Sequence, residues 1–202
     1  MPFDPNHDTS VQLRHAIDGD PQSLGWLVAH LSPLLLAQAR WRLAGGMAHV
    51  VDAEDLVQEA WLVALPRLHE LVPRDGRLTP VLLRFLATTI VHRVNNLVRD
   101  TLRRGPATAG NGVAEGVADK RTGVVTAAVR DQQRRQLLVT IEALEPIDRE
   151  VLLLRGVEQR SQATTAALLG VSGDAVAMRF SRALGRLRAL LPASLCDDLA
   201  GA

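Results

Sequence analysis

The chain has 202 residues and a formal net charge of +1, which excludes a uniformly basic nucleic-acid coat and allows one sizeable core or two small ones. Its single cysteine, Cys196, excludes an internal disulfide and a cysteine-based zinc site and fits a reducing compartment. The N-terminus lacks a basic start followed by an apolar stretch, and the apolar runs are far too short for a membrane span. We therefore expect a cytoplasmic protein that does not insert into a membrane.

Apolar residues recur at intervals of three and four along most of the chain, and the alternating patterns typical of strands are scarce. This periodicity predicts an all-α fold. One compositional break, GPATAGNGVAEGVADKRTG at 105–123, holds five glycines and one proline and offers too little apolar surface to stay packed. We therefore predict two helical domains, 10–104 and 126–192, joined by a flexible linker at 105–125.

The first strongly apolar segment is GDPQSLGWLVAHLSPLLLAQARWRL at 19–43. Because proline removes a helical hydrogen bond and crowds the preceding turn, we expect helices that break near Pro33. An apolar stripe faces inward: Trp26, Leu27, Leu31 and Leu34.

The next segment, VDAEDLVQEAWLVAL at 51–65, predicts a helix capped by Asp52. Its first turn holds Glu54 and Asp55, where carboxylates suit the helix dipole. Polar residues recur with helical spacing on one face: Glu54, Asp55, Gln58 and Glu59. The opposite face is apolar: Val57, Ala60, Trp61 and Ala64.

After a loop, a longer helix is predicted at 81–104, and it is basic although the whole chain is not. Between residues 84 and 104 there are five arginines, at 84, 93, 99, 103 and 104, and one acid, Asp100. Arginine and asparagine side chains can contact phosphates and base edges, and both types occur at 93–99. The segment is therefore a candidate nucleic-acid surface, against the simpler interpretation of a solvated helix face.

The C-terminal half contains a helix-turn-helix pattern. Pro146 suits the first turn of a helix that carries the apolar run 151–154. A short helix at 162–169 is then followed by a tight turn and a second helix from residue 173. Gly170 can adopt the left-handed conformation that ends the first helix, Val171 fills the angle between the helices, and Ser172 can cap the second.

A helical wheel of the second helix separates three groups of side chains. The buried stripe is predicted to be Val176, Phe180, Ala183, Leu184 and Leu187. One flank holds Arg179, Arg182 and Arg186. The outward face, where a recognition helix meets the major groove, holds Asp174, Met178 and Ser181.

From about residue 17 to residue 191 the chain resembles the extracytoplasmic-function (ECF) group of bacterial sigma factors, which bring RNA polymerase to promoters. The segment DAEDLVQEAWLVAL at 52–65 is similar to the part of conserved region two that grips the clamp helices of the polymerase largest subunit. The resemblance implies that Asp55, Gln58 and Glu59 bind core RNA polymerase, and that Leu56 and Trp61 support them.

The segment LLRFLATTIVHRVNNLVRDTLRR at 82–104 occupies the place of the family's promoter-melting helix, which binds the minus-ten element as it opens. The implied minus-ten contacts are Phe85, His92, Arg93, Asn95, Asn96, Arg99 and Arg103. Three of these depart from the family pattern: Phe85 replaces a common tryptophan, His92 an asparagine and Asn96 an aspartate. In the preceding loop, where the family often has an aromatic residue, this chain has only Leu71 and Val72.

The helix-turn-helix resembles region four, which binds the minus-thirty-five element. The implied contacts are Asp174, Ala175, Met178, Arg179, Ser181, Arg182 and Arg186. We expect the arginines to hold mainly phosphates, with the other four side chains nearest the bases. Ala177 and Met178 stand where the family often has a basic and a small polar residue. The resemblance also implies a regulating anti-sigma factor as a partner, besides core RNA polymerase and promoter DNA.

Two other classes of protein compete with this interpretation. A helix-turn-helix transcriptional regulator with an N-terminal sensing or dimerisation domain would explain 146–191 equally well, but not the motif at 52–65 followed by a basic helix. An enzyme would need a reactive constellation, yet none of the six histidines forms a paired-ligand motif and no glycine-rich phosphate loop follows a strand. We therefore expect no catalytic activity, no cofactor and no metal site.

Overall fold

The computed structural model describes residues 8–47, 49–104 and 124–201, and these residues form helices and connecting turns without a β-strand. The prediction of an all-α fold is confirmed. In chain order the elements are α1 (Thr9–Ile17), α2 (Pro21–Leu43), α3 (Ala53–Ala64), the 3₁₀ turn η2 (Leu65–Glu70), α4 (Thr79–Arg104), α5 (Val124–Glu142), α6 (Pro146–Val151), the π-helical turn η3 (Leu152–Val157), α7 (Gln162–Leu169), α8 (Gly173–Leu187) and α9 (Ala193–Ala200). Residues 105–123 of the predicted linker lie outside this description, and α5 begins two residues before the predicted second domain. The domain boundaries stay predictions.

α2 is a single helix, so the predicted break near Pro33 is wrong. The helix continues from Pro21 to Leu43 with Pro33 inside it. A proline in a helix interior costs about 3 kcal/mol, but Leu31, Leu34 and Leu35 around it are all fully buried. Because each buried leucine contributes about 1.5–3 kcal/mol, burial on both sides of the proline outweighs the lost hydrogen bond.

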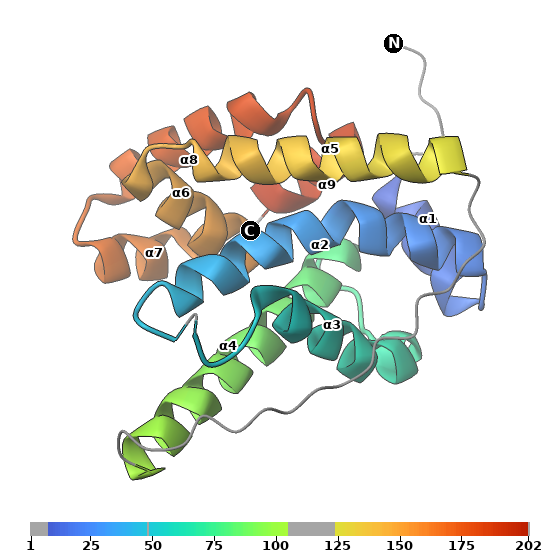
Figure 1. Ribbon diagram of the computed structural model, residues 1–202. Helices are drawn as coiled ribbons and strands as arrows, with labels where there is room; N and C mark the ends of the chain where they lie inside the picture. The colour runs from blue at the N-terminus through green and yellow to red at the C-terminus, as the bar shows by residue number, and fades with distance from the viewer. Residues whose placement is uncertain (1–7, 48, 105–123, 202) are drawn as a thin grey trace.

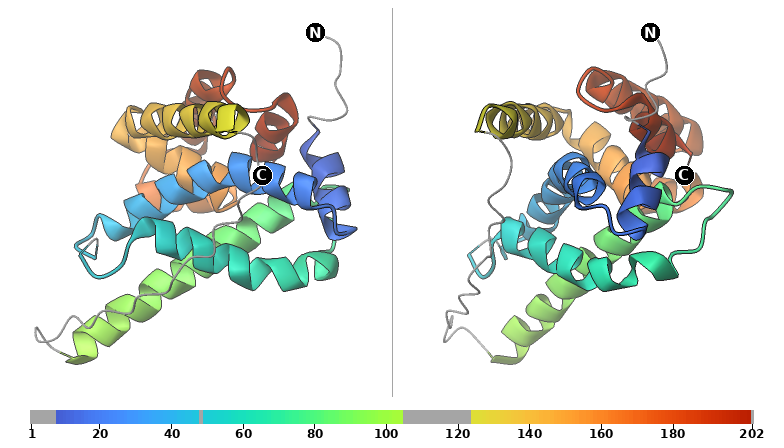
Figure 2. Two further views of the ribbon diagram at one scale, coloured as in Figure 1. Left: turned by 45° about the vertical axis from the view of Figure 1, so that its right-hand side comes forward. Right: turned by 90° about the vertical axis from the view of Figure 1, so that its right-hand side faces the viewer.

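α2 runs through the middle of the molecule, with α5 on one side and α3 and α4 on the other (Figure 1). The first half of α4 is buried beneath α2 and α3 through Leu82, Leu86 and Ile90, which are fully buried. The last turns of α4 extend beyond the other helices, as the green end of the ribbon shows in every view (Figure 2). α4 is therefore anchored at its N-terminal end and solvent-exposed at its C-terminal end.

The C-terminal half packs directly against the N-terminal half. α5 and η3 contact α2, and α9 contacts both α1 and α4. The buried apolar side chains form one continuous cluster that draws on both halves. Five of its fully buried members come from α2, α4, α5, η3 and α9: Leu35, Leu86, Ile141, Leu153 and Leu195. The described residues therefore share one core.

Candidate polymerase and nucleic-acid interfaces

The α3 helix forms as its sequence predicts, with its polar side chains outside and its apolar side chains inside. Asp52 caps it by accepting a hydrogen bond from the Glu54 N–H at 3.2 Å. The hydrogen bond from the Glu54 backbone N–H also lowers the pKa of the Asp52 carboxyl. Asp55 and Gln58 are exposed on the outer face.

The two apolar members of the predicted polymerase-binding set are core residues. Leu56 is 1% exposed and Trp61 is 6% exposed. The Trp61 indole N–H donates to the Ser32 hydroxyl of α2 at 3.1 Å, which fixes the rotation of α3 about its axis. Leu56 and Trp61 can therefore act only by supporting the exposed side chains.

Two exposed apolar residues on the same helix were not predicted, Leu62 and Val63, and Leu62 lies on the polar face. Leu62 is 63% exposed, and it lies four residues after Gln58 and seven after Asp55, which places the three on one face. A single exposed leucine is common on protein surfaces, so Leu62 adds apolar area to this face without by itself marking a binding site. The helical spacing from Asp55 could have identified it, because position 62 continues the polar face rather than the apolar stripe.

Glu59 and Arg93 form an ion pair that links α3 to α4. The Glu59 Oε2 and Arg93 Nε atoms are 2.9 Å apart, and both side chains are about half exposed at 42% and 50%. Exposed pairs of this kind contribute at most about 1 kcal/mol. Glu59 is predicted to bind polymerase and Arg93 to bind DNA, so two residues predicted for different partners contact each other here. Separating them costs little free energy.

The predicted minus-ten residues of α4 divide by exposure. Phe85 is half-buried against the core, whereas the other six are exposed: His92, Arg93, Asn95, Asn96, Arg99 and Arg103. The Arg99 guanidinium donates to the Asn96 side-chain oxygen and, at 3.4 Å, to the Asn95 carbonyl. Arg99 and the two asparagines thus form one polar group on the projecting part of α4.

The loop before α4 contains a tight turn. Asp75 and Gly76 both have positive φ, at 52° and 76°. Arg74 and Arg77 exchange two backbone hydrogen bonds across them, at 3.0 and 2.9 Å. This is the geometry that an Asp-Gly pair favours. Val72, next to the turn, is 75% exposed, so an unpartnered apolar side chain precedes the basic helix.

The helix-turn-helix has the predicted geometry. Gly170 ends α7 in the left-handed conformation with φ 65°, and the Ser172 hydroxyl caps α8 by accepting from the Ala175 N–H at 3.2 Å. Gln162 closes the turn by donating to the Gly173 carbonyl at 2.9 Å. All five residues of the predicted stripe are buried: Val176, Phe180, Ala183, Leu184 and Leu187.

The outward face of α8 is exposed at Asp174, Met178 and Ser181, and Ala175 is half-buried. Met178 is 62% exposed. These four side chains share the accessible side of the helix, and their contact with DNA stays a prediction.

The arginine flank of α8 is held by an acid that the sequence did not single out. The Asp148 carboxylate of α6 lies 2.9 Å from Arg179 Nη1 and 2.9 Å from Arg182 Nε, and its side chain is only 5% exposed. The Arg182 side chain remains 53% exposed, whereas that of Arg179 is 29% exposed. Arg186, one turn further, is exposed. Of the three arginines, Arg179 is therefore the least accessible to a phosphate.

Two comparisons with known proteins bear on these surfaces. The family description "Sigma-70, region 4" matches residues 134–187, which include α6, η3, α7 and α8. The ECF RNA polymerase sigma factor ShbA of Streptomyces griseus is 33% identical over 186 residues, covering 88% of this chain and 92% of ShbA. The chain belongs to the ECF RNA polymerase sigma factors. This sigma factor is also 28% identical to the RNA polymerase sigma factor CnrH of Cupriavidus metallidurans, over 95% of its own length and 98% of CnrH.

A solved structure of CnrH in complex with the cytosolic domain of CnrY is 25% identical, and the match covers 91% of this chain and 97% of that chain. Its TM-score of 0.39 is too low to support conclusions about how the helices are arranged.

Membership of the family establishes the general activity. This ECF sigma factor is a transcription initiation factor that binds core RNA polymerase, directs it to promoters and assists DNA opening. The alternative of a helix-turn-helix regulator with an N-terminal sensing domain is not favoured, because the match to ShbA covers both halves of the chain. None of the described helices is both long and apolar enough to cross a membrane.

Proposed function

We propose that the outer face of α3 is the surface that binds core RNA polymerase, through Asp55, Gln58 and Glu59. The observation that carries this proposal is the division of α3 into a buried and an exposed side. Leu56 and Trp61 fix the helix, while Asp55 and Gln58 remain accessible. Leu62 extends the same face with apolar area.

The two helices with basic surfaces bind different promoter elements in this proposal. The exposed end of α4 holds the minus-ten strand as it opens, and the outward face of α8 contacts the minus-thirty-five element. The projection of α4 and the capped turn before α8 support these roles. Phosphate contacts supply most of the affinity, so promoter binding weakens steeply with salt.

Three further properties follow from the family rather than from particular residues. The protein acts in the cytoplasm and catalyses no reaction itself, because polymerase performs the chemistry. An anti-sigma factor regulates it. The relative CnrH forms a complex with the cytosolic domain of CnrY, which supports a protein regulator here.

Replacement of Asp55 tests the polymerase contact. Asp55→Lys reverses a charge on the exposed face of α3, and we expect it to abolish co-elution with core polymerase in size-exclusion chromatography. Asp18→Lys is the matched control, because Asp18 is also exposed but lies at the end of α1. Circular dichroism checks that both variants fold. Undiminished co-elution of a folded Asp55→Lys variant would refute the proposed surface.

A further inference from the structure

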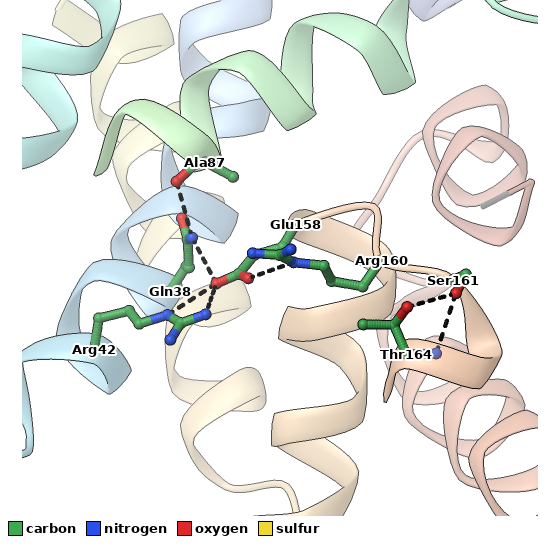
Figure 3. Close-up of polar contacts among 7 residues, drawn as sticks. All are labelled: Gln38, Arg42, Ala87, Glu158, Arg160, Ser161 and Thr164. Carbon is green, nitrogen blue, oxygen red and sulfur yellow. Dashed lines mark hydrogen bonds and ion pairs between the residues drawn. The ribbon is translucent and has the colours of Figure 1, made fainter. Parts of the chain in front are cut away.

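The buried carboxylates of Asp148 and Glu158 each hold arginines, but they face different parts of the molecule. Glu158, which follows η3, is 3% exposed, and its Oε1 accepts from Arg42 Nε at 2.9 Å and from Gln38 Nε2 at 3.0 Å, both in α2 (Figure 3). Asp148 of α6 is 5% exposed, and both of its arginine partners are on α8, the helix proposed to contact DNA. Asp148 is therefore in direct contact with a surface proposed to bind DNA.

Asp148 binds one edge of the Arg182 guanidinium and leaves the other edge free. Arg182 Nε lies 2.9 Å from Asp148 Oδ2, and Arg182 Nη2 donates to Oδ1 at 3.3 Å. A guanidinium carries its N–H donors in a planar fork, so this two-point contact fixes the plane of the whole group. The donors on Nη1 and the second donor on Nη2 remain, and the side chain is 53% exposed. Arg182 therefore offers a fixed set of donors to a ligand.

The same carboxylate withdraws Arg179 from solvent. Asp148 Oδ1 lies 2.9 Å from Arg179 Nη1, the Arg179 side chain is 29% exposed and its Nε is buried. A phosphate that binds Arg179 must therefore compete with a carboxylate that is already in place and cannot move into water. The negative charge of Asp148 also offsets one of the two positive charges of the arginines. The group thus attracts DNA less strongly than two free arginines would.

A fixed arginine and a mobile one contribute differently to DNA recognition. Phosphates repeat along both strands, so a mobile arginine finds one on any sequence and adds affinity without selectivity. An arginine with a fixed guanidinium makes good hydrogen bonds only where the acceptors fall in one place. Its contribution therefore depends on the bases or on the sequence-dependent shape of the DNA.

We propose that Asp148 is a positioning residue that sets the sequence selectivity of α8: it fixes Arg182 for one arrangement of DNA acceptors and withholds Arg179 from the phosphates. This inference rests on the proposed contact of α8 with the minus-thirty-five element. It gives different roles to two arginines that the helical wheel placed on one flank. Loss of the acid should strengthen the general attraction for DNA and weaken selectivity, whereas loss of a purely structural contact would weaken both.

Asp148→Asn tests these opposite changes in the holoenzyme, the complex of this sigma factor with core RNA polymerase. Asparagine is nearly the same size and removes the charge while keeping one oxygen acceptor. The probes are labelled promoter fragments, recovered by run-off transcription from a genomic library, and the same fragments with a randomised minus-thirty-five element. Fluorescence anisotropy measures both binding constants over a range of salt concentrations.

We expect Asp148→Asn to change the selectivity and the salt dependence together. The ratio of the two binding constants should fall by about fivefold to tenfold, because Arg182 is no longer fixed. The slope of the logarithm of the binding constant against the logarithm of the salt concentration should steepen by about 0.9, the value for one added phosphate contact. Glu145→Gln, at an exposed acid of α6 whose side chain makes no capping bond, is the matched control and should change neither quantity.

Arg179→Ala provides a second test that does not depend on replacing the acid. Alone it should leave the salt slope unchanged, because the wild-type arginine is withheld from DNA. Combined with Asp148→Asn, it should return the slope to the wild-type value and leave the ratio low. Circular dichroism and urea denaturation check that each variant is folded at the temperature of the measurement. A shallower slope in folded Arg179→Ala would show a phosphate contact and overturn the proposal.

The role of Asp148 and the proposed function fail in different ways. If randomising the minus-thirty-five element leaves binding of the wild-type holoenzyme unchanged, the proposed role of α8 is wrong and the inference falls with it. If the wild type discriminates and folded Asp148→Asn discriminates equally well, the role of α8 stands and that of Asp148 is wrong. A lower ratio with an unchanged or shallower slope would mean that Asp148 only supports the packing of α8 on α6, which also overturns the proposal.

Discussion

The two helices predicted to bind DNA are built in contrasting ways. α8 presents its basic flank from within a packed unit, where Asp148 holds two of its arginines and the whole inward stripe is buried. The end of α4, residues 99–103, is exposed at every position, and Leu102 is 79% exposed. A supported helix fits a duplex whose shape is fixed, whereas an unsupported one can follow a strand that is being unwound. The difference therefore predicts that α8 substitutions change stability and that distal α4 substitutions change only DNA binding.

The largest expected effect is at Asp148. Asp148→Ala leaves Arg179 and Arg182 without their acidic partner. We expect the free energy of unfolding to fall by about 2 kcal/mol. This is less than the ~3–5 kcal/mol for breaking a fully buried pair, because both arginines are partly exposed to water. Urea denaturation measures the change. Asp100→Ala, at an exposed acid on distal α4, is the matched control and should stay within about 0.5 kcal/mol of wild type. A similar loss in both variants would remove the contrast between the helices.

An intermediate effect is expected at the turn before α8. Gly170 has φ 65°, a conformation that costs an alanine about 1 kcal/mol or more. Gly185 lies inside α8 with no atom within 4 Å of an added Cβ. We therefore expect Gly170→Ala to lower the thermal midpoint, and Gly185→Ala to raise it because alanine favours helices by up to about 1 kcal/mol. If Gly170→Ala does not lower the thermal midpoint, the turn does not depend on the left-handed glycine.

The smallest effect on stability is expected on distal α4. Arg99→Ala should change the free energy of unfolding by less than about 0.5 kcal/mol. It should nevertheless weaken binding of the holoenzyme to promoter DNA. The slope of the logarithm of the binding constant against the logarithm of the salt concentration should also fall, by the amount expected for the loss of about one phosphate contact. Arg14→Ala, at an exposed arginine of α1, is the control. An unchanged salt slope in Arg99→Ala would mean that Arg99 does not contact a phosphate.

Features set by neighbouring residues could be predicted from the sequence, because their causes lie within one or two turns. The Asp52 and Ser172 caps, the Gly170 turn and the buried stripe of α8 are examples. The predicted break near Pro33 was wrong because the rule that proline breaks a helix considers only neighbouring residues in the sequence. The residues around Pro33 in α2 are buried in the core, and their burial outweighs that local effect.

Contacts between residues far apart in the sequence could not be predicted from helical periodicity or composition. Asp148 precedes its arginine partners by 31 and 34 residues, and Glu158 follows Gln38 by 120, so no helical period links them. Neither acid stands out in the sequence, because a solvated side chain is the usual interpretation of a single charged residue. The packing of the two halves was missed for the same reason, since composition predicted only a break between them.

The π-helical turn η3 sets the angular register of the C-terminal half. Its wide hydrogen bond, from the Glu158 N–H to the Leu153 carbonyl at 2.8 Å, spans five residues and admits one more residue than an α-helical turn. In a regular α-helix each residue adds about 100° of rotation. Removing one residue from η3 would therefore turn Glu158 by about that angle, away from α2, and would also shift α6 against α8, because the two helices pack together on either side of η3 in the sequence. A single-residue change in length would then disturb the contact between the halves and the support of α8 at the same time.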